Sequence, residues 1–141
     1  MSVDVLKFAQ DNMLLLGVAI ASGGLLIWPS LRGGGSGQTI SSAEAVGLIN
    51  REDAAVLDVR DAQEFAGGHI LNARHIPLAE LEGRLGELER LKRKPVIVCC
   101  EKGARSSAAV AVLRKGGHDK ALNLAGGLDA WRGAGLPVVR D

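Results

Sequence analysis

Cys100 is the residue of this chain best placed to do covalent chemistry. It follows the apolar run 95–99, which is typical of a buried strand, and it precedes the segment 106–113, which is typical of a helix. A thiol between a strand and the start of a helix lies where backbone N–H groups converge and where the helix dipole favours negative charge. These surroundings favour the thiolate, which is the nucleophilic form of cysteine.

The loop that follows Cys100 contains residue types that can bind an anion. Gly103 allows the backbone to curl so that its amides face inward. Arg105 adds a fixed positive charge, which can hold either the loop itself or an anionic substrate. Lys102 is either a second attraction for anions or a solvated loop lysine, and the sequence leaves both interpretations open.

Short apolar runs alternate with amphipathic segments from Thr39 onward, which predicts a parallel sheet covered by helices on both faces. Ligands of such sheets bind at the carboxyl ends of the strands, where Cys100, Asp58 and Arg60 all lie. The expected strands are 54–59, 95–99 and 121–125. The expected helices are 43–49 with Ser41 or Ser42 as its cap, a short one between Asp61 and Gly67, 79–91, 106–115 and 127–132.

The N-terminal segment is of a different kind, because no charged residue occurs between Met13 and Leu31. This length approaches the roughly 20 residues that a membrane-spanning helix needs. A buried helix of a soluble protein and a cleaved signal peptide, with a cleavage site at 19–21, are the alternatives. The apolar run continues past that site, and the preceding residues lack a net positive charge, so we expect a retained anchor.

These observations predict three parts: a membrane anchor at 1–31 with a transmembrane helix at about 12–31, a Gly/Ser linker at 32–38, and a catalytic domain at 39–141. Positive charge lies slightly more on the C-terminal side of the anchor, and reactive thiols suit a reducing compartment. We therefore expect a single-pass membrane protein whose catalytic domain is cytoplasmic.

Composition argues against several other classes of function. The net charge is +1, and the chain has two Phe, two Trp and no Tyr, so neither a basic surface nor stacking platforms indicate a nucleic-acid partner. The three histidines, His69, His75 and His118, are scattered, and the two cysteines are adjacent to each other. This spacing does not indicate a metal site, and we expect no cofactor.

Several separated blocks within 39–141 resemble the rhodanese-type sulfurtransferases. The resemblance implies a rhodanese-like three-layer α/β/α fold with a central parallel sheet. The blocks are 57–61 with Glu64 and Phe65, 68–70, 76–78, the loop 100–106, and 124–131 followed by 135–138.

The resemblance also implies an activity. Cys100 would accept a sulfane sulfur from a small thiosulfate-type donor, become a persulfide, and pass the sulfur to a thiol or another nucleophilic acceptor. Asp58 and Arg60 would support the loop. The residues implied in substrate binding are Glu101, Lys102, Gly103, Ala104, Arg105 and Ser106. This interpretation requires that reagents reach the sulfur of Cys100.

One alternative remains beside this one, and a second, a phosphatase, is rejected. The chain could be a membrane-tethered, non-catalytic rhodanese-fold adaptor that binds a membrane protein partner. A related phosphatase loop has five residues between cysteine and arginine, which is the spacing from Cys99 to Arg105, whereas Cys100 and Arg105 are separated by four. We assign Cys99 to the buried strand, because free cysteines are often buried as small apolar residues.

Overall fold

The computed structural model describes the backbone of residues 4–31 and 39–140, with side chains described at 4–27 and 39–140. The chain divides into two compact units, Met1–Gly34 and Gly35–Asp141. The predicted linker at 32–38 lies outside the described residues. Each unit is described by itself below.

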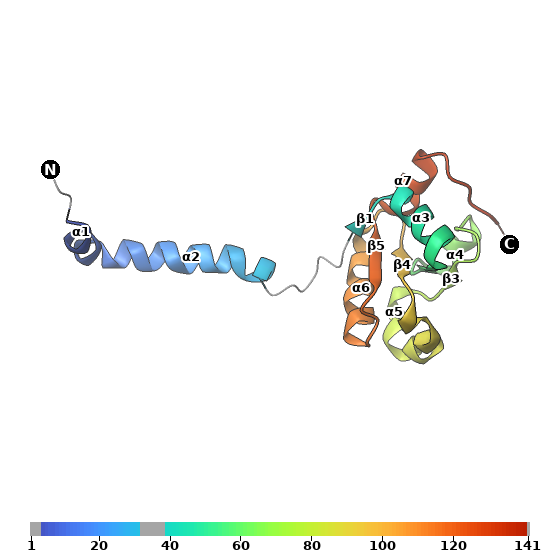
Figure 1. The fold of residues 1–141 in the computed structure, drawn as a ribbon, viewed down its shortest axis with the longest axis horizontal. Coiled ribbons are helices and arrows are strands. Elements are labelled where there is room, and N and C mark those ends of the chain that lie inside the picture. The colour runs from blue at the N-terminus through green and yellow to red at the C-terminus, as the bar shows by residue number, and fades with distance from the viewer. Residues whose placement is uncertain (1–3, 32–38, 141) are drawn as a thin grey trace. The chain divides into compact units, whose positions relative to one another are not determined.

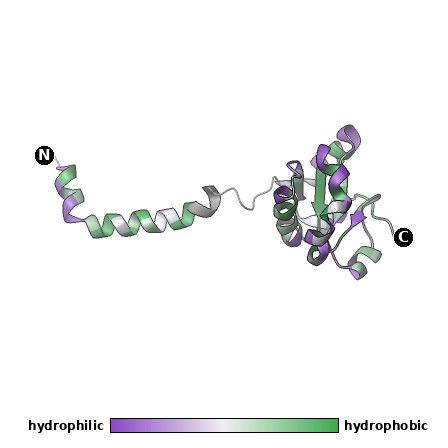
Figure 2. Cartoon of the chain, turned by 90° about the horizontal axis from the view of Figure 1, so that it is seen from below, coloured by the Kyte–Doolittle hydropathy of each residue, from purple (hydrophilic) through white to green (hydrophobic). Residues whose placement is uncertain are grey.

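The N-terminal unit consists of two helices, α1 (Val5–Asp11) and α2 (Met13–Leu31), with an 84° bend between them. Asn12 separates them: its side-chain amide donates to the Phe8 carbonyl oxygen at 2.8 Å, so it ends α1. In the described residues no single helix is long and apolar enough to cross a membrane, and only the bent pair, counted through Ile27, meets these criteria. The single transmembrane helix predicted at about 12–31 is therefore not supported. Figure 2 shows that α2 is mostly apolar as far as Ile27.

The second unit is built on a sheet of five parallel strands in the order β1-β5-β4-β2-β3. The strands are β1 (Thr39–Ile40), β2 (Ala55–Asp58), β3 (Arg74–His75), β4 (Val96–Cys99) and β5 (Ala121–Leu124). The register pairs Asp58 with Cys99, so the carboxyl ends of β2 and β4 lie side by side. The predicted central parallel sheet is confirmed. The two-residue strands β1 and β3 were not predicted.

Local capping explains where two helices begin. In α3 (Ser42–Glu52), Ser41 Oγ accepts from the Glu44 amide at 3.1 Å, as the predicted N-cap should. In α4 (Ala62–Ala66), the Asp61 carboxylate accepts from the Glu64 amide at 2.8 Å. Both helix starts follow directly from the sequence because their caps lie within three residues.

The predicted helix 79–91 is wrong in type. The chain instead forms a short α5 (Leu78–Leu81) and then the long 3₁₀ helix η1 (Glu82–Arg93). Leu85, Leu88 and Leu91 recur at every third residue, a spacing that is compatible with a 3₁₀ helix as well as with an α-helix. A 3₁₀ helix has three residues per turn and so aligns these leucines on one side, against the core.

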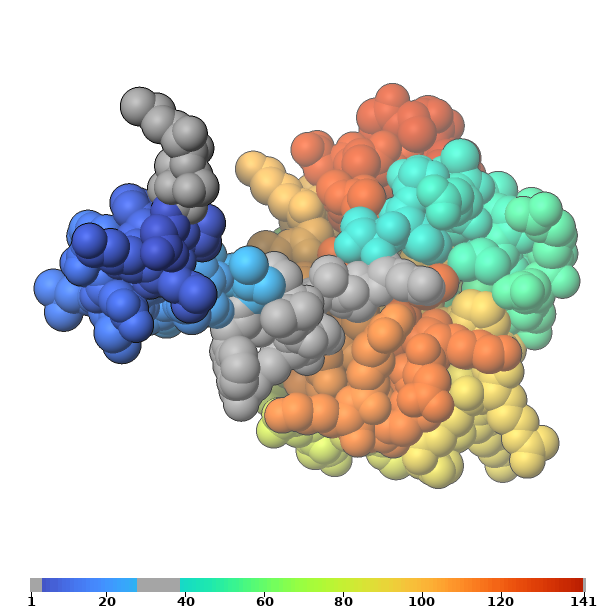
Figure 3. Space-filling view, turned by 60° about the vertical axis from the view of Figure 1, so that its left-hand side comes forward, coloured from blue at the N-terminus to red at the C-terminus, as the bar shows by residue number. Residues whose placement is uncertain are grey.

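Helices cover both faces of the sheet, which makes three layers (Figure 1). One apolar cluster joins α5, η1 and α6 (Ala104–Lys115) to one face, and the other joins α3 and α7 (Gly127–Gly133) to the opposite face. Figure 3 shows α3, in turquoise, beside α7, in red. Cys100 belongs to the first cluster and Cys99 to the second.

Candidate active site

Cys100 directly follows β4, and its sulfur is surrounded by the start of α6. The Gly103 amide donates to Sγ at 3.0 Å and the Ser106 amide at 3.3 Å. Gly103 has a φ of 105°, a left-handed conformation that favours glycine and that turns the chain into α6. Because of this turn, α6 begins at Ala104, two residues before its predicted start.

These contacts favour the thiolate. Burial raises the pKa of the Cys100 thiol, but hydrogen bonds from Ser106, Gly103 and Lys102 outweigh it and hold the pKa below that of an ordinary cysteine. The Ser106 hydroxyl lies 3.3 Å from Sγ. The environment expected from the strand–loop–helix pattern is therefore present at Cys100.

Cys99 is a different kind of cysteine. It is fully buried on the opposite side of the sheet, and that burial raises its pKa well above the ordinary value. A thiol in this position is a packing residue. Of the two cysteines, only Cys100 has the surroundings of a nucleophile.

A pocket of about 340 Å³ opens onto this sulfur. Only 1% of the surface of Cys100 is exposed, and the residue is among those that line this pocket. The lining residues are Glu64, Cys100, Glu101, Lys102, Ala104 and Arg105. Gly103 and Ser106, the other two predicted site residues, instead contribute their amides to the sulfur.

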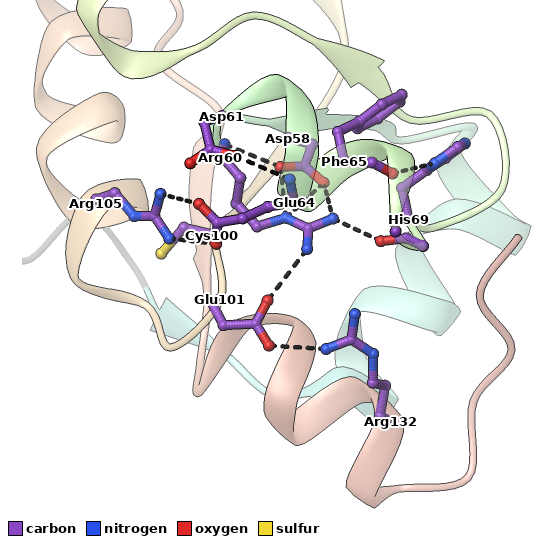
Figure 4. Close-up of polar contacts among 12 residues, drawn as sticks. Asp58, Arg60, Asp61, Glu64, Phe65, His69, Cys100, Glu101, Arg105 and Arg132 are labelled. Carbon is purple, nitrogen blue, oxygen red and sulfur yellow. Dashed lines mark hydrogen bonds and ion pairs between the residues drawn. The ribbon is translucent and has the colours of Figure 1, made fainter. Parts of the chain in front are cut away.

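Arg105 is less available to bind an anionic substrate than the sequence suggested. Its guanidinium makes two hydrogen bonds to the Glu64 carboxylate, at 2.7 and 2.8 Å (Figure 4). This pairing raises the pKa of Arg105 and lowers that of Glu64 to about 2, so both groups stay charged. Arg105 thus ties α4 to the loop. Glu64, which belongs to a block of the resemblance, was not among the predicted site residues.

Asp58 and Arg60 reach the loop through a chain of charges. The buried Arg60 guanidinium donates to Asp58 at 2.8 Å, to the Gly68 carbonyl oxygen at 2.7 Å and to Glu101 at 3.1 Å. The second oxygen of Glu101 accepts from Arg132 of α7 at 2.8 Å, as Figure 4 shows. Of the two predicted supporting residues, Arg60 therefore contacts the loop directly and Asp58 acts through Arg60, and the carboxylate of Glu101 is held by two arginines.

The start of α7 holds the other side of the loop. The Leu128 amide donates to the Cys100 carbonyl oxygen at 2.8 Å, and the Asp129 amide donates to that of Glu101 at 3.0 Å. Gly127 has a φ of 58°, and a Cβ there would collide with the Cys100 carbonyl oxygen and lie 2.6 Å from that of Glu101. The close approach of two backbones requires glycine at this position.

In the ranges 4–27 and 39–140, no three His, Cys, Asp or Glu side chains gather as metal ligands would. Two histidines have structural contacts instead. His69 Nδ1 lies 3.0 Å from the Phe65 carbonyl oxygen, and His75 Nε2 lies 2.8 Å from that of Arg60. Both rings stack on Phe65.

Comparisons with known proteins agree with this geometry. The family model described as "Rhodanese-like domain" matches residues 41–134. The chain is 38% identical over 92 residues to a sulfurtransferase of Allochromatium vinosum, a match that covers 65% of this chain and 84% of that protein. It is 45% identical over 80 residues to the uncharacterized protein YqhL of Bacillus subtilis, which covers 57% of this chain and 62% of YqhL, less than two thirds of that relative.

Among solved structures, the domain is similar to a rhodanese-related protein from Thermoplasma volcanium. The TM-score is 0.66 and the sequence identity 35%, over 73% of this chain and 98% of that one.

Proposed function

Since this chain belongs to the rhodanese-like domain family, we propose that it is a sulfurtransferase that carries a sulfane sulfur on Cys100. The observation that carries the proposal is the sulfur of Cys100 at the pocket, with the amides of Gly103 and Ser106 directed at it. A persulfide anion needs such donors and no bulky wall, because its charge lies on a large, soft atom.

The reaction has two displacements at sulfur. The Cys100 thiolate attacks the outer sulfur of a thiosulfate-type donor, the S–S bond of the donor breaks, and the leaving group departs with the electron pair. An acceptor thiolate then attacks the terminal sulfur of the persulfide, takes that sulfur atom, and leaves Cys100 as a thiolate. No oxidant or reductant is consumed. The loop amides stabilise the negative charge at each stage.

The charged residues at the pocket have separate roles in this proposal. Lys102 attracts an anionic donor, whereas Arg105 holds α4 against the loop through Glu64. Asp58 and Arg60 position the loop through Glu101 and do not contact the reacting atoms. The acidic and basic side chains that line the pocket therefore nearly balance each other in charge.

Mass spectrometry after thiosulfate treatment of the full chain tests the proposal. We expect Cys100 to gain one sulfur atom, Cys100→Ser to gain none, and the matched control Cys99→Ser to retain most of the adduct and of the turnover. An adduct on Cys99 alone would overturn the assignment. Folded protein that takes up no sulfur would instead support the alternative of a non-catalytic adaptor.

We also propose that the N-terminal unit attaches the protein to a membrane, with the catalytic domain in the cytoplasm and a membrane protein as a partner. Large apolar side chains of α1 and α2 are exposed, including Leu14 at 84%, and would be stabilised by lipid. Alkaline carbonate extraction of the full chain should leave it in the membrane pellet, and the domain should resist protease in intact spheroplasts. Release into the supernatant would contradict attachment, and digestion in spheroplasts would contradict the orientation.

A further inference from the structure

Asn123 is a polar residue in an otherwise apolar layer. It lies on β5, two residues after the buried Ala121, and so faces the α6 side of the sheet beside its register partner Val98. Only 8% of its surface is exposed. A buried amide needs hydrogen-bond partners, and Asn123 finds them at the active-site loop.

The contacts of Asn123 fix the orientation of its amide. Oδ1 accepts from the Ser106 hydroxyl at 2.6 Å, and Nδ2 lies 3.4 Å from the Gly103 carbonyl oxygen, to which it donates. Both partners belong to the turn that surrounds the Cys100 sulfur. Asn123 thus links a central strand to the atoms that stabilise the thiolate.

The Ser106 hydroxyl has one proton but three acceptors within reach. Asn123 Oδ1 lies at 2.6 Å, the Gly103 carbonyl oxygen at 3.1 Å and Cys100 Sγ at 3.3 Å. The shortest contact identifies Asn123 as the acceptor. While Cys100 is a thiol, the hydroxyl oxygen faces Sγ with a lone pair; to donate to the thiolate, which is the Ser106 hydrogen bond that lowers the pKa of Cys100, the hydroxyl must give up Asn123.

We propose that Asn123 is a positioning residue that holds the Ser106 hydroxyl proton away from Cys100 and thereby limits the ionisation of the thiol. When the thiol proton leaves to solvent through the pocket, the hydroxyl rotates from Asn123 Oδ1 to Sγ. The buried amide oxygen loses a hydrogen bond, and this loss opposes ionisation. The rate consequence for sulfur transfer rests on the proposed function, but the ionisation does not.

Other charged and titratable groups also lie near Cys100, although Cys99 points to the opposite side of the sheet. They come from α6, α4, the loop and β4, and α7 contributes one through its ion pair with Glu101. These groups are Arg105, Glu64, Glu101, Lys102, Cys99 and Arg132. Substitution of Asn123 leaves all of them in place, so a comparison among variants of this one position isolates its effect.

The test measures the rate of alkylation of Cys100 by iodoacetamide as a function of pH, in the full chain, with the modified peptide identified by mass spectrometry. Asn123→Leu, of similar volume, removes the nearest acceptor, so Sγ then competes for the proton only with the Gly103 carbonyl oxygen at 3.1 Å. We expect the midpoint to move to lower pH and the rate below the midpoint to rise about tenfold. Asn123→Asp holds the proton more strongly, so its midpoint should move to higher pH.

The matched control is Ser106→Ala, which removes the shared proton. On this background the Asn123→Leu shift should vanish and the Asn123→Asp shift should shrink. A wild-type midpoint in Asn123→Leu, or shifts that persist in full without Ser106, would overturn the proposal. If Asn123→Leu does not fold, the nearly isosteric Asn123→Asp tests the proposal, because its midpoint shift should be larger with Ser106 present than in the Ser106→Ala background. Alkylation needs no sulfur donor, so a failed sulfur-transfer assay and a failed proton-sharing test are distinguishable.

Discussion

At the scale of single residues, two adjacent cysteines have opposite properties. Cys99 ends β4 and points into the α3 and α7 side of the core, whereas Cys100 is the first residue of the loop. Burial raises the pKa of the Cys99 thiol, and hydrogen bonds lower that of Cys100. Two neighbouring positions therefore hold a packing residue, Cys99, and a thiol with the surroundings of a nucleophile, Cys100.

We expect the Glu64–Arg105 ion pair to limit the attraction of the pocket for anions. Glu64→Gln should release Arg105, lower the KM for thiosulfate several-fold, and destabilise the domain by no more than about 1 kcal/mol, as is usual for a partly exposed pair. Steady-state kinetics and urea denaturation measure the two effects. Glu80→Gln, on an exposed pair with Arg84, is the control and should leave KM unchanged. An unchanged or higher KM in Glu64→Gln would contradict this role.

The same pair has a pH dependence whose sign follows from Glu64. Its pKa of about 2 in the folded protein lies below the ordinary glutamate value, near 4.3 in an unfolded chain. The stabilisation is therefore fully present above pH ~4.3 and is lost as the pH falls toward 2. The ion pair is intact throughout the neutral range.

At the scale of elements, the site depends on how α7 meets the loop after β4. Two amides at the start of α7 donate to the carbonyl oxygens of Cys100 and Glu101, and Gly127 allows the approach. The loop therefore has its amides directed at the sulfur and its carbonyl groups held by the neighbouring helix. The start of α7 therefore helps to fix the conformation of the loop.

Gly127→Ala tests this arrangement. The added Cβ would collide with backbone oxygen atoms, and the residue has a positive φ, so we expect a loss of at least about 3 kcal/mol in the free energy of unfolding. Gly133→Ala at the other end of α7 is the control: its Cβ would meet nothing within 4 Å, and stability should stay within about 1 kcal/mol of the wild type. Chemical denaturation measures both. Equal stability of the two variants would sink this interpretation.

At the scale of the whole molecule, we expect His118 to link the stability of the domain to pH. It is 2% exposed, and neither ring nitrogen has a hydrogen-bond partner in the described part of the chain. Burial lowers its pKa, with a further lowering from the nearby Lys92. The neutral ring is compatible with the core, and the charged ring is not.

The sign of the pH effect follows from this lowered pKa. His118 causes no loss of stability above its unfolded value near pH 6.5, and stability falls as the pH drops below it. His118→Phe should flatten the free energy of unfolding between pH 7 and 5, as measured by urea denaturation at several pH values. The same slope in His118→Phe and in the wild type would show that another group is responsible.

Much of the fold could be predicted because its signals are local. Ser41 and Asp61 cap the helices that follow them by accepting from amides three residues away, and apolar runs mark β2, β4 and β5. The type of η1 was mispredicted, because leucines at intervals of three and four fit both kinds of helix until packing selects one. The short strands β1 and β3 carry no apolar run and form only by pairing with distant strands.

The sequence by itself determined that Cys100 stands between a strand and a helix and that Gly103 turns the chain beside it, because backbone conformation depends on near neighbours. Only the tertiary structure decided which charges the loop meets. Glu64 and Arg105 are 41 residues apart, Glu101 and Arg132 are 31 apart, and Asn123 is 17 from Ser106. Such partners are brought together by the order of strands in the sheet, which is set by packing of the whole domain and not by any one segment.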